Sequence, residues 1–353
     1  EIVPLPADAD QQREQLVRRL AAGDPDVDLI GMDVIWTAEF AAAGWIAPFG
    51  AEQAAALQDR LAATLESASW DGRVWAVPFT TNTQLLWYRT DRVREPPATW
   101  DDLLREAESL GADGTIEAQG ARYEGLTVLF ISLLRSAGGR VLDESGRAVS
   151  LAPEPTQRAL ALLERLAVSP AAPANFANAR EDDSRLGFET GHASFMLNYT
   201  FVWPSAQENA PEVARHMAWA RWPRASAELP SRVTLGGINV GVAARGEHPD
   251  LALRAALCLA SPDNQRAAAS LGALPPTIEA LYDDPVVRGK LPFADALRAT
   301  LRDAAQRPQT PLYSDVSLAI SSTLHPPRDI DPPATAARLR AAVDRALRSE
   351  GLL

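Results

Sequence analysis

The chain of 353 residues is poor in sulfur and in lysine, with a single cysteine, Cys258, and a single lysine, Lys290. One cysteine excludes a disulfide within the chain and a zinc site built from several cysteines. No apolar run approaches the roughly 18 to 20 residues that a helix needs to cross a bilayer. The four histidines are scattered, and the sequence lacks a nucleophile elbow, a phosphate loop and a dinucleotide fingerprint. We therefore expect a soluble chain without a cofactor or a metal ion.

Positive charge is also in short supply. The chain has 34 Lys and Arg residues against 46 Asp and Glu residues, which gives a net charge of −12. Binding to nucleic acid needs a basic surface that neutralises phosphates. The same balance disfavours attachment to a membrane surface through clustered basic residues. The composition thus excludes nucleic acid as a partner.

Segments typical of strands alternate with segments typical of helices along the chain. Residues 27–32 are short and mostly apolar, as in a strand buried on both faces of a parallel sheet, and residues 2–5 are predicted to form another strand. Apolar residues at helical spacing predict a helix over residues 10–22, and a further helical run covers residues 52–65. This alternation predicts a doubly wound α/β architecture, and the length predicts more than one lobe.

Three local signals have a clear physical meaning. Asp71 and Gly72 lie between β-favouring residues and predict a tight hairpin. Thr99 precedes an amphipathic segment over residues 100–109 and is a suitable N-cap for it. Cys258 lies in an apolar run that predicts a buried helix face, so its thiol is expected in the core. The alternative is a disulfide partner upstream of the given chain, which an exported protein could use.

Longer motifs follow one another in a fixed order over almost the whole chain. They include Pro25-Asp-Val-Asp-Leu-Ile30, Met32-Asp-Val-Ile-Trp-Thr37, Trp70-Asp-Gly-Arg-Val-Trp-Ala-Val-Pro-Phe79, Leu85-Leu-Trp-Tyr-Arg-Thr-Asp91, Gly187-Phe-Glu-Thr-Gly-His-Ala-Ser-Phe-Met-Leu-Asn-Tyr199, Leu235-Gly-Gly-Ile-Asn239 and Arg307-Pro-Gln-Thr-Pro-Leu-Tyr313. Together they resemble the carbohydrate-binding extracellular solute-binding proteins of bacterial ABC importers, the group that includes maltose-binding protein. Within that group, Asp33 before Trp36-Thr-Ala-Glu-Phe40 and the string Asn198-Tyr-Thr-Phe-Val-Trp203 are most similar to the mycobacterial trehalose-binding lipoprotein.

The resemblance implies an α/β, two-lobed, periplasmic-binding-protein-like fold, in which each lobe is a doubly wound sheet flanked by helices and hinge crossovers join the lobes. Lobe one would hold residues 1–82 and 237–308, and lobe two would hold residues 83–236 and 309–353. The crossovers would fall near residues 82–84, 235–237 and 307–310. Family members begin with a strand and a helix before the segment that opens this chain, so no ligand contact from that part is assigned.

The resemblance also implies a function. The chain would be the substrate-binding receptor of an ABC sugar importer that captures a disaccharide between its lobes and delivers it to the membrane permease. Trehalose is the first choice of ligand, and maltose or another oligosaccharide is the alternative. The receptor would catalyse no reaction. It is expected to be a monomer outside the cytoplasmic membrane, held at the outer face by a lipid anchor.

The chemistry of a sugar indicates which residue types should bind it. A sugar presents hydroxyls on its rim and apolar C–H faces, so its site needs carboxylates and amides for hydrogen bonds and aromatic rings for stacking. In open α/β sheets, ligands lie beyond the carboxyl ends of the strands. Asp33 follows the predicted strand 27–32, and Asn82 follows Val-Pro-Phe-Thr-Thr. Both are candidate ligand residues, with an N-cap as the alternative for Asp33 and a turn asparagine for Asn82.

The other candidates lie in the second half of the chain. Glu181 opens an acidic run that resembles the family's acidic pair before a helix, although a helix cap is the alternative. Tyr199 and Trp203 lie where maltose-binding relatives have their stacking aromatics.

The remaining candidates lie at the two later crossovers. Gly236 and Gly237 would let the backbone approach the sugar, or would serve as a hinge. Arg307 has a planar guanidinium that can bind two adjacent hydroxyls or a carboxylate.

Two further functions stay open on the residues alone. A glycoside hydrolase also uses aromatics and paired carboxylates, which Asp33 and Glu181 could supply, but neither lies in an enzyme motif. A sensor or adhesion module would bind sugar with the same two lobes and feed no importer. Neighbouring permease and ATPase genes would distinguish that module from a receptor.

Overall fold

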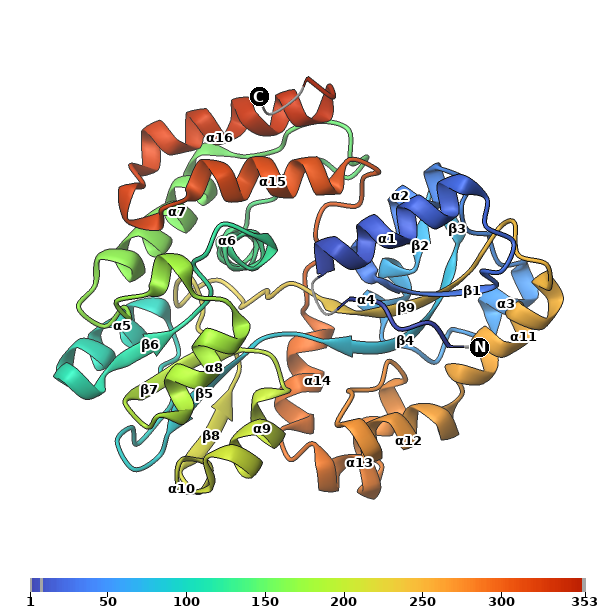
Figure 1. Ribbon diagram of the computed structural model, residues 1–353. Helices are drawn as coiled ribbons and strands as arrows, with labels where there is room; N and C mark the ends of the chain where they lie inside the picture. Colours follow the sequence, from blue (N-terminus) through green and yellow to red (C-terminus); the bar gives the residue numbers. More distant parts are fainter. Residues whose placement is uncertain (1, 7–8, 351–353) are drawn as a thin grey trace. The chain divides into compact units, whose positions relative to one another are not determined.

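The computed structural model describes residues 2–6 and 9–350, and the chain divides into two compact units. Unit 1 comprises Glu1–Thr81 and Gly236–Leu291, and unit 2 comprises Asn82–Leu235 and Pro292–Leu353. Both units combine a sheet with flanking helices (Figure 1). The chain therefore passes between the units three times.

Unit 1 is built around a three-stranded sheet in the order β1-β9-β4, and β2 and β3 form a separate two-stranded sheet. The bounds of these strands are β1 (Leu29–Asp33), β2 (Ser69–Trp70), β3 (Arg73–Val74), β4 (Ala76–Asn82) and β9 (Gly236–Val242). Its helices are α1 (Ala9–Ala22), η1 (Val34–Trp36), α2 (Thr37–Ala42), α3 (Ala51–Ala55), α4 (Ala62–Ser67), α11 (Pro249–Leu259), α12 (Pro262–Gly272), η4 (Glu279–Asp283) and α13 (Pro285–Lys290).

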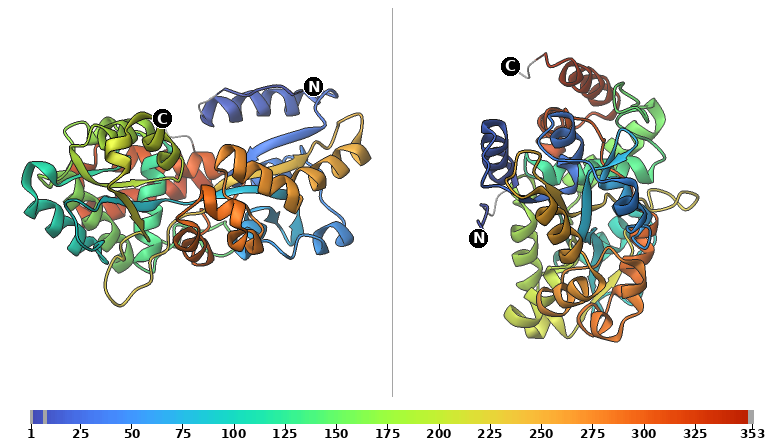
Figure 2. Two further views of the ribbon diagram at one scale, coloured as in Figure 1. Left: turned by 90° about the horizontal axis from the view of Figure 1, so that it is seen from below. Right: turned by 90° about the vertical axis from the view of Figure 1, so that its right-hand side faces the viewer.

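The two faces of the unit 1 sheet are covered by different helices, because side chains alternate along a strand. Ile30 and Met32 of β1 pack in one apolar cluster with Leu16 of α1 and with α2. On the other face, β9 packs with α11. The run of α1 along the strands can be followed in Figure 2. The core of unit 1 therefore has two halves, separated by the sheet.

Two expectations for this sheet were wrong. The first predicted strand, residues 2–5, forms no strand, since Pro4 has no N–H to donate to a ladder. Residues 27–32 were expected to be buried on both faces of a parallel sheet. Instead, β1 pairs antiparallel with β9, from Leu29 opposite Val242 to Asp33 opposite Ile238, and Gly31 is exposed.

Local signals elsewhere had mixed outcomes. The hairpin at Asp71 and Gly72 is confirmed: both residues have positive φ, and they join β2 to β3. The single helical run expected over residues 52–65 is two short helices, α3 and α4. Cys258 is exposed on α11 rather than buried, because the buried face of that helix is formed by small alanines.

Unit 2 is built around a four-stranded sheet in the order β6-β7-β5-β8. Its strands are β5 (Leu85–Arg89), β6 (Thr115–Glu117), β7 (Ala193–Asn198) and β8 (Met217–Ala220). Its helices are α5 (Trp100–Ser109), η2 (Gly111–Asp113), α6 (Glu124–Ser136), α7 (Pro153–Val168), η3 (Phe176–Asn178), α8 (Glu181–Glu189), α9 (Val202–Asn209), α10 (Pro211–Ala214), α14 (Ala294–Arg302), α15 (Tyr313–Leu324), η5 (Pro327–Asp329) and α16 (Pro332–Leu347).

The sheet of unit 2 is mixed. β5 pairs antiparallel with both β7 and β8, whereas β6 pairs parallel with β7. Thr99 caps α5 as expected, since its side chain accepts a hydrogen bond from the Asp102 N–H. The bounds predicted for α5 agree with the structure. Local patterning was therefore sufficient for this helix.

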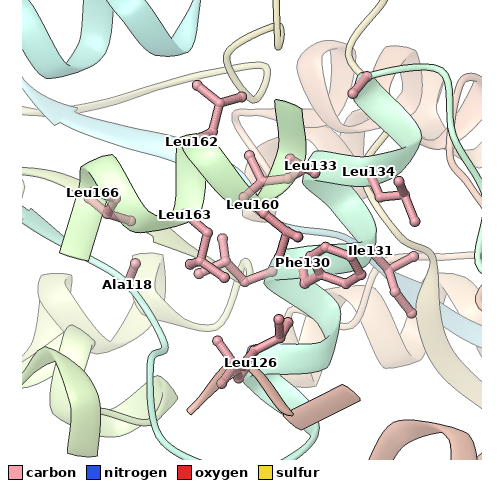
Figure 3. Close-up of a cluster of buried hydrophobic side chains, with 14 of the residues drawn as sticks. Ala118, Leu126, Phe130, Ile131, Leu133, Leu134, Leu160, Leu162, Leu163 and Leu166 are labelled. Carbon is pink, nitrogen blue, oxygen red and sulfur yellow. The ribbon is translucent and has the colours of Figure 1, made fainter. Parts of the chain in front are cut away.

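The main core of unit 2 lies among α6, α7, α15 and α16. Figure 3 shows Phe130 of α6 with Leu160 and Leu163 of α7 between the two helices, and all three side chains are fully buried. Burying one such side chain stabilises the fold by about 1.5 to 3 kcal/mol. This helical layer gives the sheet of unit 2 a rigid support.

The unit boundaries differ from the expected lobes mainly in one place. Residues 292–308, expected in lobe one, group with unit 2. The reason is packing, because Phe293 lies edge-on to Trp87 and to Trp219, with ring centroids 5.3 Å and 5.8 Å apart. The other two boundaries lie within one residue of the expected positions. Over residues 2–6 and 9–350, no helix combines the length and apolar character needed to cross a membrane.

Candidate ligand-binding site

The first turn of α8 brings together a carboxylate, a guanidinium and a phenol. Arg180 is the N-cap, and its backbone N–H donates to the Asp183 carboxylate over 2.9 Å. Acidic residues in a first turn are favoured by the partial positive charge of the helix N-terminus. The Arg180 guanidinium lies over the Tyr123 ring, 4.7 Å from its centroid. Glu181 is the first helical residue and faces the same tyrosine.

Burial dominates the electrostatics of these side chains. It raises the pKa of the Glu181 carboxyl above its ordinary value, because a desolvated carboxylate is less stable than one in water. It also raises the pKa of the Tyr123 hydroxyl, and the nearby Glu181 carboxylate adds to that shift. The Tyr123 oxygen is buried and makes no hydrogen bond of ordinary geometry to any described residue. A buried hydroxyl without a partner costs about 1 to 3 kcal/mol.

Tyr199 lies close enough to contribute to the field at Tyr123. It follows β7 directly, and its N–H donates to the Asn198 side chain over 2.8 Å. We call Tyr123, Arg180, Glu181 and Tyr199 the α8 cluster. Glu181 and Tyr199 were expected in the site from the sequence, and the structure brings them together. Tyr123 was missed, because nothing in its local pattern distinguishes it from a core aromatic.

Trp203, which follows Tyr199 by four residues, belongs to a separate aromatic cluster. Its ring lies edge-on to Trp219 with centroids 5.2 Å apart, and Trp219 contacts Trp87 and Phe293. Trp87 and Phe293 are fully buried, whereas Trp203 and Trp219 are only half-buried. The two outer rings are thus held by a rigid base and keep part of their surface open. Trp219 was not singled out in the sequence, although its position in the alternating Met-Ala-Trp-Ala of β8 is a usable signal.

A set of buried polar side chains lies beneath α8. The Gln119 amide donates to the Ser184 hydroxyl over 3.2 Å and accepts from Gln84 over 2.7 Å. Glu117, only 5% exposed, ends β6, and a Cβ atom at Gly187 of α8 would lie 2.2 Å from its carboxylate. Burial raises the pKa of Glu117 to about 7, and the negative charge of Asp183 adds to the shift. The helix that carries Glu181 therefore rests on a polar, titratable base.

Asp33, in unit 1, acts as the N-cap of η1. Its carboxylate accepts a hydrogen bond from the Ile35 N–H over 3.1 Å, and the side chain is half-buried at the end of β1. The capping interpretation is therefore correct. Trp36, which follows, is buried and packs on Phe40, so it belongs to the core.

Asn82 ends β4 at the first boundary between the units. Its side-chain oxygen is buried and accepts no hydrogen bond from any described residue. A buried amide oxygen is expected to have a partner, so Asn82 stays a candidate ligand residue.

Gly236 and Gly237 open β9. Gly237 has a φ of +136°, and a Cβ atom there would lie 2.3 Å from the Thr80 carbonyl oxygen. Both facts require glycine, since an L side chain would be strained and would clash with β4. Close packing within unit 1 therefore explains Gly237 without a ligand.

Arg307 is buried in unit 2, with 7% of its surface exposed. Its guanidinium donates to the Glu124 carboxylate over 2.8 Å and to the Leu235 carbonyl over 3.3 Å, and it lies 6.0 Å from the Tyr313 ring centroid. The Tyr313 and Ser317 hydroxyls donate to the same carboxylate. We call Glu124, Arg307, Tyr313 and Ser317 the Arg307 network. The guanidinium expected to bind sugar is thus engaged with protein groups.

In the part of the chain that the structure describes, no group of three or more His, Cys, Asp and Glu side chains could hold a metal ion.

Comparison with known proteins agrees with this arrangement of sheets and helices. Residues 1–266 match the family model for bacterial extracellular solute-binding proteins. The chain belongs to that family.

Individual relatives and solved structures support this assignment to different degrees. A probable ABC transporter-binding protein of Deinococcus radiodurans is 28% identical over 346 residues, which are 92% of this chain and 80% of that protein. The maltose-bound structure of T. maritima MalE3 is 30% identical, with a TM-score of 0.86 over 97% of this chain and 90% of that one. The maltotriose-bound protein of Thermus thermophilus, 20% identical, has a TM-score of 0.77 over 98% and 92% of the two chains, which speaks for the fold alone.

This solute-binding protein therefore has the two-domain α/β periplasmic-binding-protein fold, with mixed sheets and flanking helices. It is a substrate-binding protein of the ABC transporter type and a receptor rather than an enzyme.

Proposed function

We propose that this solute-binding protein is the receptor of an ABC sugar importer for an α-linked disaccharide, trehalose first and maltose second, which it delivers to a membrane permease. The observation that carries the proposal is the Tyr123 hydroxyl, which is buried beside the Glu181 carboxylate and interacts with it only outside ordinary hydrogen-bond geometry. A sugar hydroxyl both accepts and donates. The sugar hydroxyl would accept a hydrogen bond from the Tyr123 hydroxyl and donate one to the Glu181 carboxylate. Both protein groups would then have a hydrogen-bond partner.

The aromatic cluster supports the same ligand class. Trp203 and Trp219 are half-buried and rest on two fully buried rings. A pyranose has apolar C–H faces that pack on such rings. The maltose in T. maritima MalE3 and the maltotriose in the Thermus protein favour α-linked glucose units among the sugars to be tested.

Unit 1 would contribute to binding through Asp33, and Asn82, Gly236 and Gly237 would act near the crossovers. A sugar held by residues of both units favours the state in which it contacts both, which gives an open–closed equilibrium. We place the receptor outside the cytoplasmic membrane as a lipid-anchored monomer.

Calorimetric titration of trehalose, maltose, maltotriose, sucrose and glucose tests the proposal. We expect one α-linked disaccharide to bind most tightly to the wild-type protein. Glu181→Gln should weaken it by about 10- to 100-fold, because a hydrogen bond to a charged group contributes about 1.5 to 3 kcal/mol.

The matched control is Glu212→Gln, the same chemical change on the exposed face of α10, where Glu212 forms an ion pair with Arg215. It should bind like the wild type. A wild-type protein that binds none of these sugars would refute the proposed function. Equal affinities in the wild type and Glu181→Gln would remove Glu181 from the site.

A further inference from the structure

Asn198 joins two members of the α8 cluster that come from different segments. It is the last residue of β7 and is fully buried. Its Nδ2 donates to the Glu181 carbonyl over 2.9 Å, and its Oδ1 accepts from the Tyr199 N–H over 2.8 Å. One amide therefore links the first turn of α8 to the start of the segment that follows β7.

Asn198 is itself firmly placed. Its carbonyl oxygen accepts a hydrogen bond of 2.9 Å from the Trp87 indole, and it lies opposite Leu85 in the ladder between β7 and β5. The amide is thus attached to a buried strand of the sheet. Glu181, by contrast, lies at a helix end, where the backbone has fewer hydrogen bonds of its own.

We infer that Asn198 is a positioning residue of the sugar site, which sets the Glu181 carboxylate and the Tyr199 ring in their relative places without touching the ligand. This inference rests on the proposed function. An amide suits the position because it has a donor at one end and an acceptor at the other. Aspartate keeps the acceptor for Tyr199 but loses the donor for Glu181, and alanine loses both.

The first test compares Asn198→Ala and Asn198→Asp with the wild type by titration calorimetry, using the disaccharide that the wild type binds most tightly. At neutral pH we expect each variant to lose affinity by about 10-fold or more, the size of one or two hydrogen bonds.

Gln265→Ala is the matched control for a simple loss of stability. Gln265 is a buried amide in unit 1 that donates to the Ala260 carbonyl and accepts from the Thr277 N–H, and it contacts no candidate ligand residue. The Gln265→Ala variant should show a fall in Tm similar to that of the Asn198 variants. Its affinity for the sugar should stay within about 2-fold of the wild type.

A pH series provides the second readout. When the new aspartic acid of Asn198→Asp is protonated, it again has one donor and one acceptor. The ratio of its Kd to that of the wild type should therefore fall toward 1 as the pH decreases to about 5, since burial raises the pKa of an aspartate. The ratio for Asn198→Ala should not change with pH. If Asn198→Ala does not fold, Asn198→Asp decides alone.

Three results would overturn the inference: wild-type affinity in both Asn198 variants, an equal loss in Gln265→Ala, or a Kd ratio for Asn198→Asp that is independent of pH. All three leave the proposed function intact. A wild-type protein without affinity for any sugar would overturn both.

Discussion

Unit 2 contains two groups of Arg, Glu and Tyr that are similar in composition and different in hydrogen bonding. In the Arg307 network, the Glu124 carboxylate accepts from Arg307, from Tyr313 and from Ser317. In the α8 cluster, the Tyr123 hydroxyl has no such bond, although it is buried beside Glu181.

The difference separates a structural role from a ligand-binding role. A carboxylate that already accepts from three protein donors, as Glu124 does, gains little from a ligand, whereas a desolvated hydroxyl without a partner at ordinary geometry gains more. Residue type alone would have ranked the two groups the other way, since Arg307 was a candidate from the sequence and Tyr123 was not.

Removal of the central charge should have the largest effect. Arg307→Ala leaves the Glu124 carboxylate without its cation and should lower the free energy of unfolding by about 3 kcal/mol or more. Denaturation with urea measures this change. Sugar affinity at temperatures where the variant is folded should change much less. A variant of wild-type stability that had lost its affinity would instead place Arg307 in the sugar site.

Glu117 provides a third case beside Glu124 and Glu181. Its carboxyl is buried, but it has neither a cationic partner nor a proposed sugar ligand. Its folded pKa of about 7 lies above the unfolded value of 4.5. Between these values the folded protein keeps a proton that the unfolded chain has released, so stability falls as the pH rises through this window and is then constant.

The shift corresponds to about 3 kcal/mol. Glu117→Gln should therefore be more stable than the wild type by up to that amount at about pH 8, and close to it at about pH 4.5. Thermal unfolding at the two pH values checks this. A constant difference between wild type and variant would contradict the shift.

Glu181 should give sugar binding its own pH dependence. Burial raises the pKa of its carboxyl above the ordinary value, so the proton returns at a higher pH than in an exposed glutamate. Affinity that depends on the carboxylate should decline as the pH falls through the acidic range, and the decline should begin at a higher pH than an exposed glutamate would give. Titrations of the wild type and Glu181→Gln over this range measure it, and the variant should show no such decline. A wild-type affinity that is constant with pH would speak against a charged Glu181 in the site.

The smallest and sharpest contrast is between two single hydroxyls. Tyr123→Phe removes an oxygen that has no protein partner at ordinary hydrogen-bond geometry, so it should leave the free energy of unfolding unchanged or raise it, and should weaken sugar binding by about 5- to 10-fold. Tyr313→Phe removes a donor to Glu124 and should lower stability by about 1 kcal/mol without affecting binding. The same result in both variants, in either measurement, would abolish the distinction between the clusters.

Much of the architecture could be predicted from local sequence. The hairpin at Asp71 and Gly72 needs positive φ, the cap at Thr99 needs a short hydroxyl side chain, and β7 is an apolar run that ends in a turn. Each of these depends on a few neighbouring residues.

The candidate site was predicted less completely. Glu181, Tyr199 and Trp203 were found through resemblance, and the structure places the first two together. Tyr123 and Trp219 were missed, because their importance depends on partners far away in the sequence. The orientation of β1 and the grouping of residues 292–308 with unit 2 likewise depend on distant contacts.

The sequence by itself determined the family, the succession of strands and helices, and the residue types available to bind a sugar. Only the tertiary structure decided which of these side chains find partners within the protein: Arg307 meets Glu124 across 183 positions of the sequence, and the Tyr123 hydroxyl is enclosed without a hydrogen bond of ordinary geometry. The physical reason is that burial and hydrogen-bond satisfaction are properties of the packed interior, where a polar group is either paired or costly.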